Sequence, residues 1–108
     1  MEIADLLATE PASIAPWAYR VYERIRRQPL PDEEFRALFE RGIEVSLRRH
    51  DMVGLHASLG LAANYYASIG DQFGCLPYFE ETMQRVLGDP EARAIVLQCT
   101  HDILIGNS

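Results

Sequence analysis

The fold of this chain is decided by the stretch Gly60-Leu-Ala-Ala-Asn-Tyr-Tyr-Ala-Ser-Ile-Gly-Asp-Gln-Phe73, which has the pattern of a helix end followed by a tight turn. Apolar residues lead into the turn at alternating spacings of three and four, at Met52, Leu55, Leu59, Ala62, Tyr66 and Ile69. Such spacing places the side chains on one face of a helix. The pattern predicts the central helix of an all-helical domain, with this face against the core.

A second face of the same helix carries only small or short polar side chains, at His56, Gly60, Ala63, Asn64 and Ala67. A glycine inside a helix costs about 1 kcal/mol relative to alanine. We therefore expect a neighbouring backbone to approach closely at Gly60. This interpretation puts the face inside the domain, and a homodimer formed through the face is the alternative.

The rest of the chain also has helical spacing, interrupted by proline and glycine. Residues 1–12 contain few apolar positions and predict a short helix or a docked arm. We expect helices over about 13–28 and over 52–69, and between them a helix from a cap at Asp32 to beyond Arg49. Two more helices are expected after residue 69: one holds Pro77 in its first turn, and the other begins at Pro90 after a cap at Asp89. No segment alternates as a strand would. The sequence thus predicts an all-α single domain over 1–108, with about five antiparallel helices in a compact bundle or a stack of helical hairpins.

Composition narrows the classes of partner. The 108 residues carry a formal net charge of −6. This charge argues against binding to nucleic acid or to an anionic membrane, because both require a basic surface. No signal-peptide pattern and no window of about 18 apolar residues occurs, so we expect a cytoplasmic protein. Cys75 and Cys99 have the spacing of neither a zinc site nor a disulfide framework and are interpreted as reduced core residues.

The sequence offers little for catalysis. His50, His56 and His101 do not have the one-turn spacing that places two metal ligands on one helix face. No glycine-rich phosphate loop is present. The pair Glu80-Glu81 is interpreted as an exposed helix face. We expect no catalytic residues, no metal and no cofactor; a Cys–His nucleophilic pair is the alternative that the sequence leaves open.

One hairpin resembles the tetratricopeptide class, in which small and aromatic residues surround a Gly-Asp turn. The residues that carry this resemblance are Tyr66, Gly70, Asp71, Cys75, Phe79, Thr82 and Pro90. The resemblance implies a pair of antiparallel helices of the kind used to bind other proteins.

A broader resemblance rests on the order of four motifs: Asp32-Glu-Glu-Phe-Arg-Ala-Leu38, Arg41-Gly-Ile-Glu44, Ile69-Gly-Asp-Gln-Phe73 and Leu87-Gly-Asp-Pro-Glu-Ala-Arg93. In this order the chain is similar to small helical proteins encoded beside type VI secretion spike and effector genes. The resemblance implies a non-enzymatic adaptor or chaperone that helps an effector or spike component to assemble.

The predicted binding surface lies near the central turn, where aromatic rings are expected to anchor a partner. It consists of Tyr65, Asp71, Gln72, Phe73 and Tyr78. The alternative is that Phe73 and one tyrosine complete the core. Two other functions stay open: an immunity protein whose acidic surface blocks a toxin, and a regulatory or sensory domain of a signalling protein.

Overall fold

A computed structural model describes residues 3–8 and 10–106 of the chain; parts of the predicted arm and residues 107–108 lie outside that range. The described residues form six α-helices and no strand, which confirms the all-α prediction. The helices are α1 (Ile3–Ala8), α2 (Ile14–Arg27), α3 (Asp32–Arg48), α4 (Met52–Ser68), α5 (Leu76–Arg85) and α6 (Pro90–Leu104).

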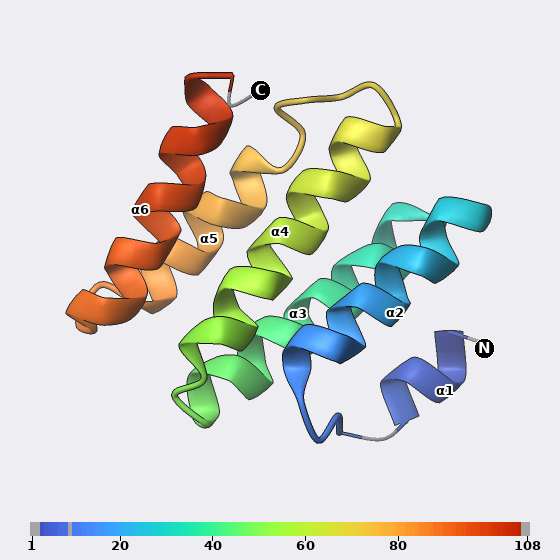
Figure 1. Cartoon of the computed structure of the whole chain (residues 1–108), viewed down its shortest axis with the longest axis horizontal. Coiled ribbons are helices and arrows are strands. Elements are labelled where there is room, and N and C mark those ends of the chain that lie inside the picture. The colour runs from blue at the N-terminus through green and yellow to red at the C-terminus, as the bar shows by residue number, and fades with distance from the viewer. Residues whose placement is uncertain (1–2, 9, 107–108) are drawn as a thin grey trace.

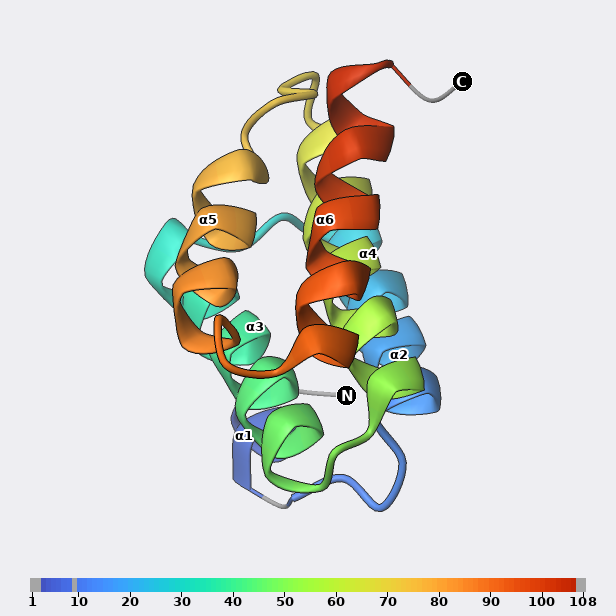
Figure 2. The ribbon, with the colours of Figure 1, turned by 90° about the vertical axis from the view of Figure 1, so that its left-hand side faces the viewer.

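Helix α4 is the centre of the molecule, as its apolar spacing predicts, and packs against α2, α3 and α6. Figure 1 shows α2 and α6 on opposite sides of α4. In Figure 2, turned by 90°, α2, α4 and α6 form one layer, while α3 and α5 form a second layer with α1 beside α3. Within the layer of α2, α4 and α6, one face of α4 lies between α2 and α6.

The core lies between the two layers. Its largest fully buried side chains include Phe35, Phe39, Phe79, Ile14, Leu38, Ile43, Leu55 and Leu59. Trp17 is buried as well, and its indole N–H donates to the Leu6 carbonyl at 3.4 Å. This hydrogen bond attaches α1 to α2, so residues 3–8 form the short helix that was one of the two alternatives for this segment.

Close packing of the kind expected at Gly60 occurs between α3 and α4, at two other glycines. A Cβ atom added to Gly42 would lie 2.5 Å from Ser58 Oγ, and one added to Gly54 would lie 2.8 Å from Ser46 Oγ and 2.7 Å from Ile14 Cβ. Each glycine therefore faces a serine of the other helix, and neither position has room for a methyl group.

Gly60 lies on a different face of α4, and the expectation of close packing there is wrong. A Cβ atom added to Gly60 would meet no other atom within 4 Å. Helices α2 and α6 lie on the two sides of α4 (Figure 1), and the small-residue face between them lines open hollows. Ile69 also differs from expectation: it is exposed, because it follows the last residue of α4 and leaves the core with the turn.

The ends of α3 differ from the prediction in two ways. The first is that Pro31, rather than Asp32, precedes α3, since the Pro31 carbonyl accepts the N–H groups of Glu34 and Phe35 at 3.0 and 3.1 Å. The second is that α3 ends at Arg48, because His50 adopts a left-handed backbone conformation with φ of 51°. His50 Nε2 then lies 2.8 Å from Glu91 Oε1, which links this turn to the start of α6.

Asp89 caps α6 as predicted, and its loss is expected to be measurable. Its carboxylate accepts the N–H groups of Glu91 and Ala92, both at 3.2 Å. Asp89→Ala is expected to lower the free energy of unfolding by about 1 kcal/mol in a urea titration, because these groups lose their acceptor. Ser13 precedes α2 without a side-chain capping bond, so Ser13→Ala is the matched control and is expected to change stability by less than about 0.5 kcal/mol. Equal losses in the two variants would contradict the capping role of Asp89.

Candidate protein-binding groove

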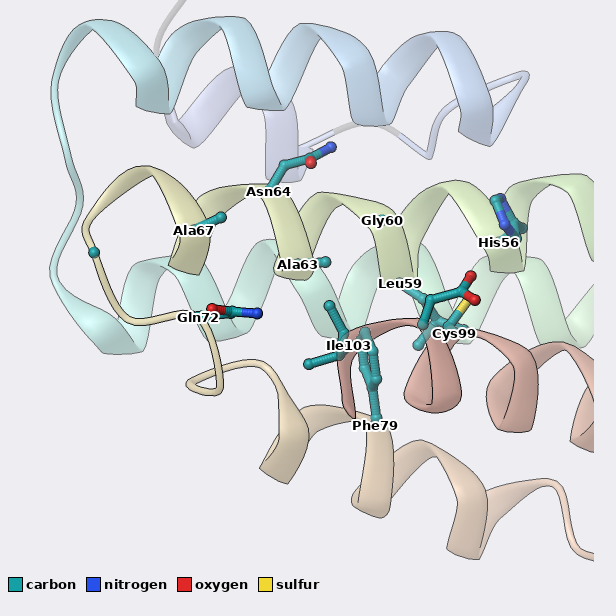
Figure 3. Close-up of a pocket in the computed structure, with 12 residues that line it drawn as sticks. His56, Leu59, Gly60, Ala63, Asn64, Ala67, Gln72, Phe79, Cys99 and Ile103 are labelled. Atoms are coloured by element: carbon teal, nitrogen blue, oxygen red, sulfur yellow. The ribbon is translucent and has the colours of Figure 1, made fainter. Parts of the chain in front are cut away.

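The uncovered face of α4 forms the floor of a groove, which we name the α4 groove. It has a volume of about 540 Å³ and lies between α4, α6 and the loop after α4 (Figure 3). Its lining residues are His56, Leu59, Gly60, Ala63, Asn64, Ala67, Gly70, Gln72, Phe79, Cys99, Asp102 and Ile103. The small side chains of the floor leave this space empty, and Gly60 contributes bare backbone to it.

A second hollow continues the groove toward α2. It has a volume of about 240 Å³ and is lined on the α2 side by Tyr19 and Tyr22. His56, Gly60 and Asn64 line both hollows, so the two share the floor of α4. In Figure 3, Asn64 points toward α2, while Gln72 and Ile103 lie on the other side of the groove. The α4 groove therefore extends across α4, with α2 as one wall and α6 as the other.

The groove combines an apolar surface with a few polar groups. Leu59, Phe79 and Ile103 are apolar, and the polar groups include His56, Asn64, Gln72 and Asp102. Asp102 Oδ1 accepts a hydrogen bond from Gln98 Nε2 at 2.8 Å. This composition is typical of binding sites, in which apolar surface supplies affinity and a few polar groups fix orientation.

Cys99 contributes a thiol to the wall of the groove, but this thiol is a poor nucleophile at neutral pH. Burial, with a smaller contribution from the Asp102 carboxylate, raises the pKa of Cys99 to about 11. The thiolate is the nucleophilic form of cysteine, and at neutral pH this side chain is the protonated thiol. Burial likewise raises the pKa of Cys75. Both cysteines are buried free thiols.

Two of the five predicted binding residues, Tyr65 and Tyr78, are core residues. They are 3% and 4% exposed, which corrects the expectation that they anchor a partner at the surface. The Tyr65 ring stacks on Phe35 with centroids 4.3 Å apart, and its hydroxyl donates to the Leu30 carbonyl at 3.2 Å. The Tyr78 hydroxyl accepts a hydrogen bond from Tyr66 at 3.0 Å. Both rings pack against Phe35 of α3, Tyr65 from α4 and Tyr78 from α5.

The other three predicted residues, Asp71, Gln72 and Phe73, are exposed in the loop between α4 and α5. Gln72 lines the α4 groove, whereas Asp71 and Phe73 are not among its lining residues. Phe73 is 53% exposed, so it does not complete the core as the alternative interpretation supposed. A binding role for these three residues stays a prediction.

Sequence reasoning named most of the groove floor but assigned it to the interior. The signal that distinguishes the two cases was the pair His56 and Asn64, polar side chains that an interior helix face would have to satisfy with hydrogen bonds. Asp102 was missed altogether, because α6 brings it to the groove from a distant part of the sequence.

Several charged side chains outside the groove form ion pairs at the surface. Among residues 3–8 and 10–106, no group of three or more His, Cys, Asp or Glu side chains is placed to hold a metal ion. Glu81 pairs with Arg36 at 3.0 Å and Glu40 with Arg85 at 2.9 Å, and both ion pairs join α3 to α5 at the surface. Both pairs are about half exposed and add little to stability, and the buried contacts of Phe35 and Phe39 with Tyr78 join the two helices.

A third hollow of about 330 Å³ lies on the outer face of α5 and α6 and is lined by apolar side chains such as Leu76, Met83, Leu97 and Leu104. Leu97 and Leu104 are more than half exposed. In the described part of the chain, no helix has the length and apolar character needed to cross a membrane.

No protein-family model matches this chain, and no curated protein or solved structure matches it either. The geometry of the groove is thus the basis for a functional proposal.

Proposed function

We propose that this chain is a non-enzymatic adaptor or chaperone that binds another protein through the α4 groove. The observation that carries the proposal is the uncovered face of α4, where Gly60, Ala63 and Ala67 leave a long concavity between α2 and α6. A helix face of this kind in the middle of a domain normally buries itself against a neighbour. A segment of a partner protein would complete the packing that the chain itself leaves undone.

The partner expected first is a type VI secretion effector or a spike component, because of the resemblance in motif order described above. An adaptor would carry such a protein onward in active form. The net charge of −6 favours a second candidate, an immunity protein that covers the basic surface of a toxin. The two functions differ in one measurable property, since a toxin loses its activity in an immunity complex.

The test of the proposal is affinity capture with a variant that fills the groove. Gly60→Trp places an indole on the groove floor, where an added Cβ atom meets no other atom within 4 Å. Val53→Trp is the matched control, because Val53 is an exposed residue of the same helix and lines none of the three hollows. We expect the wild type and Val53→Trp to recover the same effector or spike protein from a lysate of the source organism, identified by mass spectrometry. Recovery by Gly60→Trp is expected to fall at least tenfold.

Circular dichroism establishes first that both variants are folded. Equal recovery by the two tryptophan variants would reject the groove as the binding surface. Failure of the wild type to enrich any effector, spike or toxin would reject the proposed class of partner. If a toxin is recovered, its activity in the complex distinguishes immunity from delivery.

A further inference from the structure

The α4 groove contains one carboxylate and no side chain that is permanently cationic. Asp102 is half-buried in the wall formed by α6, and neither an arginine nor a lysine lines either hollow of the groove. Among the residues that the structure describes, Asp102 makes no ion pair. Its one side-chain hydrogen bond comes from Gln98 Nε2, and the other titratable side chains of the groove are His56 and Cys99, with Tyr19 and Tyr22 in the second hollow.

An occupant of the groove changes the solvation of this carboxylate. In the free protein, water reaches Asp102 and satisfies its remaining acceptor sites. A carboxylate has about four such sites, and Gln98 fills one of them. A chain segment laid over the groove removes that water, and a carboxylate taken out of water is costly unless a cation pairs with it. The groove therefore favours an occupant that brings a positive charge to Asp102.

The dimensions of the groove favour a helix as the occupant. The floor of the groove runs along α4 from His56 to Ala67, a length of about 17 Å at a rise of about 1.5 Å per residue. Glycine and alanine on the floor allow the axis of another helix to come near, as small residues do at close helix crossings. The walls supply apolar contacts from Tyr22 on α2 and Ile103 on α6.

We propose that the occupant of the α4 groove is an amphipathic helix of the partner protein that packs its apolar face on Ala63 and Ala67 and places an arginine or lysine against Asp102. This inference rests on the proposed function and specifies the chemistry of its partner. The acidic net charge of the chain adds a long-range attraction for a basic segment.

The probe is a phage-displayed library of 16-residue helical peptides, selected on the wild-type protein and counter-selected on Gly60→Trp. Enriched peptides are synthesised, and their dissociation constants are measured by fluorescence anisotropy. We expect them to carry a basic residue at one fixed helical position.

Asp102→Asn preserves the size of the side chain and removes its charge, and is expected to weaken binding about tenfold or more, because a hydrogen bond between charged groups is lost. Glu80→Gln removes a negative charge from an exposed residue outside the groove and is expected to change affinity less than twofold.

A charge exchange gives a second, independent measurement. Asp102→Arg is expected to abolish binding of the basic peptide and to restore it when glutamate replaces the basic residue of the peptide. Enriched peptides without a basic residue, or equal binding to the wild type and Asp102→Asn, would overturn the charge inference while leaving groove binding intact. A selection that yields no peptide able to distinguish the wild type from Gly60→Trp would overturn the helical occupant, whereas the capture experiment decides the proposed function separately.

Discussion

Phe35→Ala is expected to lower the free energy of unfolding by about 3–5 kcal/mol, because it removes a fully buried aromatic ring and leaves a cavity. Phe35 stacks on Tyr65 and meets Tyr66 and Tyr78 edge to face, with ring centroids 5.8 and 5.7 Å away. The substitution thus removes the common partner of three tyrosines on α4 and α5. A urea titration followed by circular dichroism measures the change.

The matched control for this prediction is Phe73→Ala. Phe73 has the same side chain but lies half in solvent in the loop after α4, so its removal is expected to cost less than about 0.5 kcal/mol. A loss at Phe73 as large as the loss at Phe35 would contradict the burial of Phe35 and the exposure of Phe73.

Gly54→Ala is expected to lower the free energy of unfolding by about 1 kcal/mol, although alanine is the better helix former. The new methyl group would lie 2.7 Å from Ile14 Cβ and 2.6 Å from Asp51 Oδ2, and Ile14 is fully buried, so α2 and α4 must move apart. Overpacking of this kind costs about 1–3 kcal/mol, and at a position as tight as this one the cost exceeds the gain in helix propensity of about 1 kcal/mol.

Gly60→Ala is the control on the same helix, and the expected sign is the opposite. Its methyl group enters the empty groove, so only the gain in helix propensity remains, and stability is expected to rise by about 1 kcal/mol. The midpoints of urea unfolding compare the two variants directly. A midpoint for Gly54→Ala at or above that of the wild type would contradict the close approach of α2, α3 and α4 at Gly54.

The contrast between Gly54 and Gly60 also shows what the sequence predicts and what it does not. Apolar spacing, proline and glycine identify the helices well, because these signals act within one element. The same signals show that one face of α4 carries small side chains, but they do not show whether a neighbouring helix covers that face. Both glycines lie in one helix, and only the positions of α2, α3 and α6 distinguish the packed one from the open one.

The residues of the candidate site also differ in whether the local sequence predicts their position. Gln72 was predicted from the turn and does line the groove, because the turn is local. Tyr65 and Tyr78 were placed at the surface for their proximity to that turn, yet their burial depends on Phe35, which belongs to another helix. Asp102 had no local signal at all. Whether Tyr65, Tyr78 and Asp102 lie in the core or in the groove depends on contacts between distant segments, and the local sequence around each residue does not predict those contacts.

The succession of the helices in space has a consequence for how the chain folds. Each helix from α2 onward packs against one that lies within two elements of it in sequence, as α4 does with α2, α3 and α6. Helical domains with such local contacts form in milliseconds or less, because only short loops must close before packing begins. The growing chain can therefore assemble helix by helix during synthesis, and the groove is complete once α6 docks beside α4.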